Sequence, residues 1–248
     1  MKIYFFTKQN LCWAGIALLL MTGLSVYSLV FWHEDSVASL GEAIYQGNSG
    51  QKAVAMTVNV DWGEEFIPAM LKEFKEHKAQ ATFFVTGQWA EKNPELLKQM
   101  KKEGHSIQNH GFKHLHFNSL AAEQAQTQIK QAEAVIEKIT GEKSRFFAPP
   151  YGEKNQALVN SVAAMNYQYI MWSIDTIDWQ RPGPQTIVNR VVNKLHNDAI
   201  ILMHPTEPTV KALPDMLDKI EEQGYKMLTI DKIICDKDGK SLNNVKAN

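Results

Sequence analysis

Cysteine is nearly absent from this sequence. Two cysteines occur among the 248 residues, Cys12 inside an apolar run near the start and Cys235 near the end. They are not expected to pair, so a domain outside the cell must be held together by its hydrophobic core and not by disulfides. A metal site made of cysteines is excluded too, because the only two cysteines are not expected to come together.

An excess of charge of either sign is also missing. Lysine and arginine total 26, aspartate and glutamate total 27, and the net charge is -1. Without a basic stripe, the sequence gives no indication of a nucleic-acid partner. Low-complexity segments and internal repeats are lacking too, and 44% of the residues are hydrophobic. We therefore expect one globular domain with a full core, acting as a monomer.

Long apolar runs are absent except at the N-terminus. Residues 11–32 contain no charged side chain, and a helix of that length can cross a bilayer. Lys2 and Lys8 precede the run, whereas Glu34 and Asp35 follow it. Positive charge before the span favours a cytoplasmic N-terminus. We expect residues 1–34 to anchor the chain in the cell membrane, with the rest extracytoplasmic.

The alternative for this segment is a cleaved signal peptide, which would make the protein secreted. Residues 36–38 (SVA) offer a processing site, although the apolar run is long for a signal peptide. The polar residues 35–51 predict a linker. We expect the folded domain over residues 52–236 and a tail over residues 237–248.

Apolar patterns of strand and helix type alternate along the domain. Helices are predicted at 65–78, 94–102, 121–139, 156–164, 184–195 and 212–223, and strands at 53–60, 81–85, 105–108, 146–147, 167–172, 199–203 and 226–230. Such alternation predicts an α/β fold with a mostly parallel sheet. No glycine-rich phosphate turn follows the first strand, which argues against a doubly wound dinucleotide fold. A closed or incomplete (β/α) barrel is expected, with its site at the carboxyl ends of the strands.

Polar clusters occur at five of these strand ends. They are residues 59–63 (NVDWG), 109–116 (NHGFKHLH), 148–152 (APPYG), 175–179 (DTIDW) and 202–205 (LMHP). A single polar residue after a strand is usually structural. Clusters at five successive strand ends indicate a common site.

His110 and His114 are the expected metal ligands. One helical turn would put both rings on one face, close enough to share a divalent ion. A catalytic metal needs a third protein ligand and an open position, and Asp61 or Asn59 is nearest in the predicted fold. This spacing is common by chance, so the pair alone is a weak signal.

Acid–base chemistry is expected from the other clusters. His204 is placed to donate a proton to a leaving group, and Asp178 or Asp175 would orient its ring. A carboxylate, with Asp61 the candidate, would take a proton from water. The alternative is that the neighbouring aromatic and proline residues are only core and turn. Two further histidines, His105 and His116, are expected to be structural or surface residues.

These motifs resemble those of the NodB-type polysaccharide deacetylases, carbohydrate esterase family 4. The resemblance covers residues 52–234 and implies a distorted (β/α) barrel. It also implies hydrolysis of the amide bond of N-acetyl groups in peptidoglycan or a chitin-like polymer. A divalent metal is implied with it, Zn²⁺ first and Co²⁺ or Ni²⁺ as substitutes.

The resemblance assigns roles motif by motif. HGFKH implies metal ligation by His110 and His114. DTIDW and LMHP are intact and imply that Asp178 pairs with His204 as the general acid. The implied substrate-binding residues are Tyr151, Trp179, Leu202 and Pro150, with Asn59 and Asp175 as further orienting candidates.

Two motifs depart from the family pattern. Where the family has two aspartates in T-F-D-D-G, this chain reads TVNVDWG, so Asp61 alone remains as base or third ligand, and Asn59 falls at one possible base position. Where the family has an arginine before Pro-Tyr-Gly, this chain has Ala148. The variant resembles the membrane-anchored YlxY/PdaB group of spore-forming bacteria, which implies a role in sporulation or envelope maturation.

Three functions remain open on the sequence. The favoured one is a working deacetylase that uses Asp61. The second is a catalytically silent domain that keeps the fold and binds cell-wall glycan. The third is a metal-dependent hydrolase acting on an amide or ester outside carbohydrates.

Overall fold

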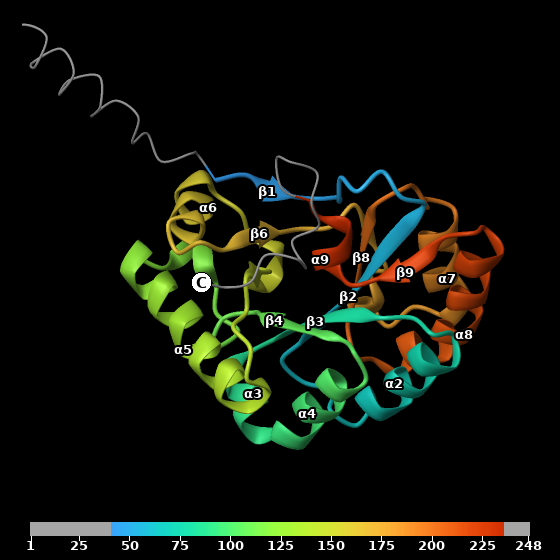
Figure 1. Ribbon diagram of the computed structural model, residues 1–248, viewed down its shortest axis with the longest axis horizontal. Helices are drawn as coiled ribbons and strands as arrows, with labels where there is room; N and C mark the ends of the chain where they lie inside the picture. Colours follow the sequence, from blue (N-terminus) through green and yellow to red (C-terminus); the bar gives the residue numbers. More distant parts are fainter. Residues whose placement is uncertain (1–40, 236–248) are drawn as a thin grey trace, which may run out of the picture. The chain divides into compact units, whose positions relative to one another are not determined.

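The computed structural model describes residues 41–235 (Figure 1). The expected anchor within residues 1–34, Cys12 and the tail at 237–248 lie outside the described residues. Within residues 41–235, no helix is both long and apolar enough to cross a membrane.

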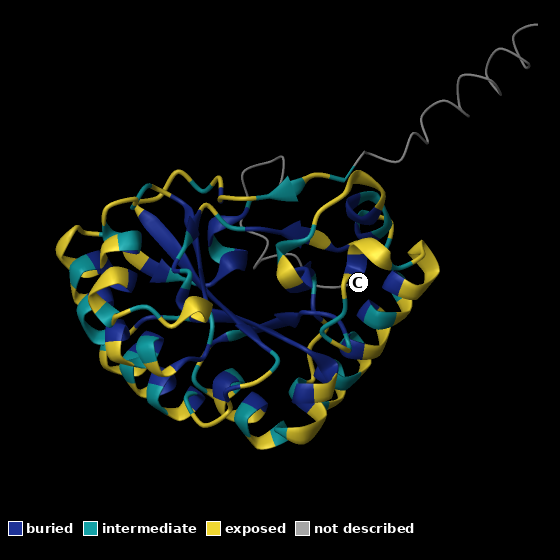
Figure 2. Ribbon diagram, turned by 180° about the vertical axis from the view of Figure 1, so that it is seen from behind, coloured by how far each residue is buried: buried dark blue, intermediate teal, exposed yellow. Residues whose placement is uncertain are grey.

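A curled sheet of parallel strands forms the centre of the domain. Its order is β1-β6-β5-β4-β3-β2-β8-β7, and β9 also pairs with β2. The strands are β1 (Ala43–Ile44), β2 (Ala53–Val60), β3 (Ala81–Val85), β4 (Ser106–Asn109), β5 (Phe146–Phe147), β6 (Gln168–Ile170), β7 (Ile174–Asp175), β8 (Ala199–Met203) and β9 (Lys226–Leu228). The helices surround this sheet, and Figure 2 shows buried strands inside with exposed helix faces outside.

The strand β2 is the axis of the sheet. All eight of its residues are buried, as expected for a parallel strand covered on both faces. It pairs along its length with β8, near its start with β9 and near its end with β3. Its carboxyl end therefore lies between the ends of β3 and β8.

The sheet is a half-barrel. Of the two predicted forms, a closed and an incomplete barrel, the structure therefore has the incomplete one. Among residues 41–235, no pairing joins the edge strands β1 and β7. Residues 171–173 link β6 to β7 instead. Met171 N donates to Ile44 O at one edge, and Ser173 N donates to Ile200 O at the other.

Seven helices cover the outer face of the sheet. They are α2 (Ile67–Glu76), α3 (Gly87–Lys92), α4 (Pro94–Lys102), α5 (Ala122–Thr140), α6 (Gln156–Ala163), α7 (Pro184–Val192) and α8 (Glu207–Glu222), whereas the short α9 (Ile230–Ile233) packs against the inner face. The helix α5 agrees with its prediction because Ile129, Ala132 and Ile136 recur at helical spacing and are buried. Gly141 ends it with a left-handed φ of 75°.

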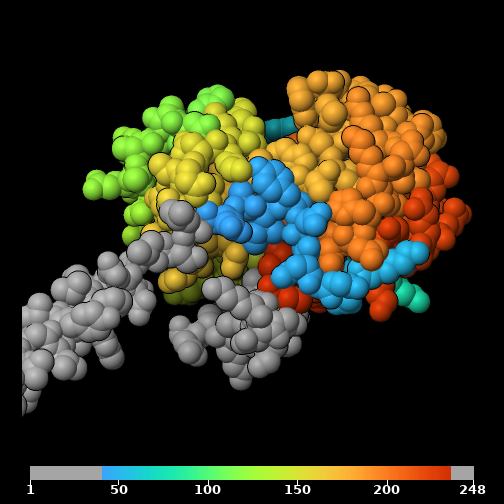
Figure 3. Space-filling model, turned by 90° about the horizontal axis from the view of Figure 1, so that it is seen from above, coloured from blue at the N-terminus to red at the C-terminus, as the bar shows by residue number. Residues whose placement is uncertain are grey.

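The predicted linker over residues 35–51 was wrong in its last part. The strand β1 pairs with β6, and Gly47 N donates to Asp198 O. Ser49 Oγ and Gly50 N both donate to the Asp198 carboxylate. Figure 3 shows this segment lying across the surface of the domain. The segment was predicted to be a linker because its composition is polar. It is attached to the domain instead by backbone hydrogen bonds and by the buried Asp198 carboxylate.

Two C-terminal boundaries also differ from the predictions. The helix α8 begins at Glu207, before the expected 212, because Thr206 caps it and Pro208 falls in the first turn, where proline is tolerated. The last strand stops at Leu228, and Ile230, expected to end it, is the first residue of α9.

Candidate active site

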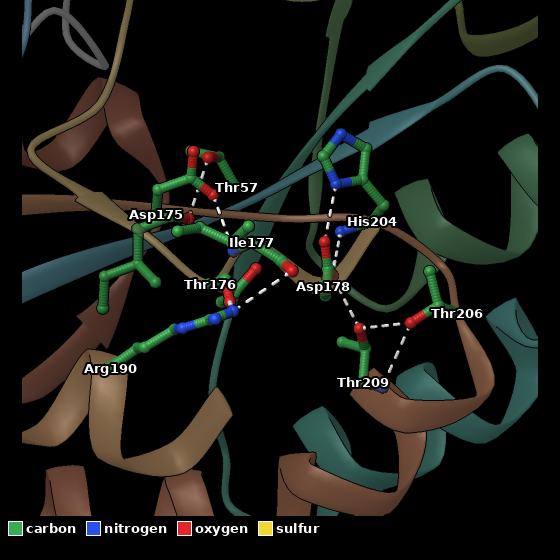
Figure 4. A network of polar contacts seen from close by, with 10 residues as sticks. Thr57, Asp175, Thr176, Ile177, Asp178, Arg190, His204, Thr206 and Thr209 are labelled. Atoms are coloured by element: carbon green, nitrogen blue, oxygen red, sulfur yellow. Dashed lines mark hydrogen bonds and ion pairs between the residues drawn. The ribbon is translucent and has the colours of Figure 1, made fainter. Parts of the chain in front are cut away.

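The five polar clusters meet at the carboxyl ends of β2, β4, β5, β7 and β8. In Figure 4, the residues after β7 and β8 point toward one another at this end of the sheet. The prediction that one edge collects the chemistry-bearing residues agrees with this placement.

The His110 and His114 rings lie together, with centroids 5.2 Å apart. No helical turn joins them, contrary to the prediction, because the chain after β4 is an irregular bend. Gly111 takes a left-handed φ of 80°, and its N–H donates to Asn109 Oδ1 at 2.8 Å. Asn109 Nδ2 in turn donates to Ile129 O in α5 at 2.9 Å. A buried asparagine thus fixes the bend that brings the histidines together.

Both histidines are held neutral. His110 Nδ1 lies 2.7 Å from Ala148 O, and a carbonyl can only accept, so Nδ1 carries the proton and Nε2 keeps its lone pair. Burial lowers the pKa of His110 to about 3. Burial also lowers the pKa of His114, with the charge of Asp61 opposing the shift. Neutral imidazoles with a free ring nitrogen suit a divalent metal.

Asp61 lies beside this pair, directly after β2. Its Oδ1 accepts a hydrogen bond from Thr86 Oγ1 at 2.7 Å. The Thr86 oxygen also caps α3 by accepting from Trp89 N, which ties the carboxylate to a rigid helix start. Within residues 41–235, no group of three histidine, cysteine or acidic side chains is arranged around one metal position. The donor set that fits a metal is therefore the histidine pair, and the roles of Asp61 stay predictions.

Asn59 occupies the next-to-last position of β2. It is buried at 7% exposure and pairs in register with Phe84 of β3. Its position two residues before Asp61 puts its amide on the strand and not in the following loop. An amide at that position cannot act as a base at neutral pH.

His204 is fixed by Asp178, as shown in Figure 4. His204 Nδ1 donates to Asp178 Oδ1 at 2.8 Å. The other carboxylate oxygen accepts from His204 N and from Thr209 Oγ1, both at 2.6 Å. Asp178 is fully buried, whereas the His204 side chain is 20% exposed. The free Nε2 of His204 is therefore the atom available to a substrate.

The loop that carries Asp178 is itself braced. Asp175 Oδ1 accepts from Ile177 N at 2.8 Å, so Asp175 shapes the loop and Asp178 alone contacts His204. Arg190 Nη1 of α7 donates to the carbonyls of Thr176 and Ile177 at 2.9 and 3.2 Å. Ile177 has a φ of 51°, which is rare for a β-branched residue. The surrounding bonds hold this strained turn in place.

Three exposed aromatic side chains belong to the polar clusters at the strand ends. Trp62 is 42% exposed, and Tyr151 and Trp179 are each 57% exposed. The Tyr151 ring lies 4.5 Å from the His114 ring and stacks on His116 at 3.9 Å.

The remaining predicted substrate contacts are far less accessible. Leu202 is 4% exposed in β8, and Pro150 is also buried. The substrate roles predicted for Tyr151, Trp179, Leu202 and Pro150 stay predictions.

The two histidines expected to be structural or surface residues, His105 and His116, have hydrogen-bond partners outside the proposed metal site. His105 Nδ1 accepts from Ala81 N in the core, and His116 Nδ1 bonds to Glu153 at 2.7 Å. Sequence reasoning missed Thr86, Thr209 and the contact of Trp62 with His204. A single threonine at a helix cap or in a first helical turn carries no motif that marks it as the partner of a carboxylate.

Comparison with known proteins identifies the family. The family model for polysaccharide deacetylases matches residues 46–170. A peptidoglycan-N-acetylglucosamine deacetylase of Bacillus cereus is 32% identical over 200 residues, which cover 78% of this chain and 93% of that protein. The chain belongs to the polysaccharide deacetylase family.

Two further relatives match this chain at higher identity. The uncharacterized protein YlxY of Bacillus subtilis is 38% identical over 193 residues, covering 78% of this chain and 60% of YlxY. The crystal structure of wild-type BA3943 from Bacillus anthracis, described as a CE4 family pseudoenzyme, has 37% identity and a TM-score of 0.75, covering 78% of this chain and 69% of that one. A BA3943 mutant with restored enzymatic activity has also been solved.

Proposed function

We propose that this protein hydrolyses N-acetyl groups on a cell-wall amino-sugar polymer, peptidoglycan or a chitin-like glycan. The observation that supports it most is the Asp178–His204 pair, which is complete and faces the neutral His110 and His114 pair. A domain that only binds glycan has no need of a buried carboxylate that orients a histidine.

The histidine pair would hold a divalent metal, with zinc as the first choice. Neutral imidazole nitrogens are donors that such an ion prefers, and one of the two rings has its second nitrogen fixed by a carbonyl. When bound, the metal supplies a lowered pKa for water and polarisation of the acetyl carbonyl oxygen.

The residues of this chain then divide the proton transfers. Asp61 takes a proton from the attacking water, whose oxygen forms the new bond to the acetyl carbon. His204 gives its Nε2 proton to the amide nitrogen as the carbon–nitrogen bond breaks, which releases acetate and the free amine. Asp178 stabilises the protonated ring of His204 before that transfer.

A silent glycan-binding domain is the second candidate. It is favoured by two replacements, Asn59 at a possible base position and Ala148 where the family has arginine. The similarity to BA3943, a pseudoenzyme, agrees with it. If it holds, Asn59→Asp should produce acetate release that the wild-type chain lacks, whereas Asn59→Ala should not.

Location and context belong to the same proposal. The apolar run at residues 11–32 supports a membrane anchor with the domain on the outer side, where the wall polymer lies. The resemblance of the altered first motif to the YlxY/PdaB group of spore-forming bacteria supports a role in sporulation or envelope maturation.

The test is acetate release. The purified full chain, in mild detergent with added zinc or cobalt, is incubated with chitotetraose and with isolated peptidoglycan. We expect release that His204→Ala reduces by about 10²–10⁴-fold, the usual contribution of a general acid. No release, with glycan binding that survives His204→Ala, would establish the silent domain instead.

A further inference from the structure

Trp62 is the one exposed aromatic residue of the described site that lies parallel to the expected acid. Its ring centroid is 6.5 Å from that of His204, and the two planes differ by 6°. The indole is 42% exposed, so much of it faces solvent next to the reactive histidine. A large apolar ring held in water at a polar site is a common sign of a binding surface.

The turn that carries Trp62 is rigid. On one side, Asp61 is bonded to Thr86. On the other, Gly63 has a φ of 84°, and a Cβ there would lie 2.4 Å from Pro205 O. The backbone of residues 61–63 is thus packed against the residue that follows His204. The indole is presented from a fixed position and gives up little conformational freedom on binding.

The chemistry of a hexosamine fits this surface. A pyranose ring has an apolar face of C–H groups that an aromatic ring can cover, while its hydroxyls stay in water. The amine released in the proposed reaction leaves from the His204 side, so the sugar ring that bears it lies on that side too.

We propose that Trp62 is a specificity-determining residue that packs against the pyranose ring carrying the acetamido group. It selects N-acetylated amino sugars over acetamides without a ring. This inference rests on the proposed function. An indole beside an imidazole can also act only on the histidine, by favouring its protonated form. That role would change the rate without changing glycan affinity, so binding separates the two.

The experiment measures chitotetraose binding to the full chain by calorimetry. Trp62→Ala should raise the Kd about tenfold, and Trp62→Phe, which keeps a smaller ring, should raise it less. Tyr45→Ala is the matched control, because Tyr45 is about as exposed as Trp62 and its hydroxyl accepts from Lys154, while no ring contact joins it to a histidine among the described residues. It should leave the Kd unchanged.

A second measurement does not depend on how well the variants fold. The indole N–H signal of Trp62 in wild-type protein, assigned through its loss in Trp62→Phe, should shift as chitotetraose is added. An unchanged signal, or equal affinity in Trp62→Ala, would overturn the role of Trp62 while glycan binding stands. Absence of any binding by the wild-type chain would overturn the proposed function and this inference together.

Discussion

Asp178 uses both of its carboxylate oxygens inside the protein. One oxygen accepts from the His204 ring, and the other accepts from His204 N and from the hydroxyl of Thr209. Thr209 therefore donates to Asp178, and Thr206 must donate to Thr209, since their hydroxyl oxygens are 2.7 Å apart. This chain of donors fixes the charge that orients the expected acid.

Thr209→Val should weaken this arrangement without changing its volume. The buried carboxylate would lose one donor, which costs roughly 1–3 kcal/mol of unfolding free energy. Urea unfolding measures that loss, and Thr209→Ser, which keeps the hydroxyl, should lose clearly less. Equal losses in the two variants would show that the methyl packing matters and the hydrogen bond does not.

At the residue scale, the sequence motifs predicted contacts between residues that belong to the motifs themselves. The pairing of Asp178 with His204 follows from DTIDW and LMHP together, and the structure places the two side chains in contact. The supporting residues could not be predicted in the same way. Thr86 caps α3 and Thr209 lies in the first turn of α8, and their contact with a carboxylate depends on how helices pack around the sheet.

Individual elements carry buried polar groups that respond to pH. The clearest case outside the site is His105, which directly precedes β4 and is buried in the core. Its ring contacts Phe74 and Phe83, and its Nδ1 accepts from Ala81 N. Burial lowers its pKa to about 4, although the charge of Glu103 opposes the shift.

This buried histidine should make the fold less stable in acid. Between pH 6.5 and about 4, the unfolded chain binds a proton at His105 that the folded chain does not. The free energy of unfolding should therefore fall as pH falls through this window, by roughly 3 kcal/mol from this group.

Denaturant unfolding at several pH values checks the effect against His105→Asn. Asparagine keeps an acceptor near the Nδ1 position for Ala81 N but does not titrate. The variant should show a smaller loss between pH 6.5 and 4. A loss as large as that of the wild-type chain would assign the acid sensitivity to other groups.

At the element scale, the spacing of apolar residues predicted strands and helices well where an element buries a continuous apolar face. The strand β2 and the helix α5 have such patterns and appear within a residue of their predicted ranges. The helical turn considered for bringing His110 and His114 together is a bend instead, because spacing alone does not reveal the positive φ of Gly111. The strand β1 was missed because two residues carry no period.

The whole domain includes its N-terminal segment. Residues 43–50 are bound through β1 and through Asp198, which is 5% exposed and has a φ of 60°. Asp198→Ala would remove the acceptor for Ser49 and Gly50 and would strain the backbone. We expect a loss of roughly 2–4 kcal/mol of unfolding free energy.

Asp198→Asn is the matched variant, because asparagine tolerates the left-handed region and keeps one acceptor oxygen. It should lose less than half as much stability in the same urea titration. An Asp198→Ala variant as stable as the wild-type chain would mean that the contacts of residues 43–50 with Asp198 do not stabilise the fold.

At the scale of the molecule, alternation of strands and helices predicted a parallel α/β fold with its site at one edge. The degree of closure could not be predicted, because it depends on the short crossing at residues 171–173 that joins two sheet edges. The family assignment agrees with the motifs, and the altered first motif leaves Asp61 as the carboxylate on which the proposed activity would depend.

Acetate release from chitotetraose by Asp61→Asn, compared with Asn59→Ala, tests that dependence most directly. With Asp61 as the base, Asp61→Asn should lower the release rate by about 10²–10⁴-fold, and Asn59→Ala should change it by less than about tenfold. Urea unfolding first verifies that both variants unfold at the same midpoint as the wild-type chain. Release by Asp61→Asn at the wild-type rate would contradict the account.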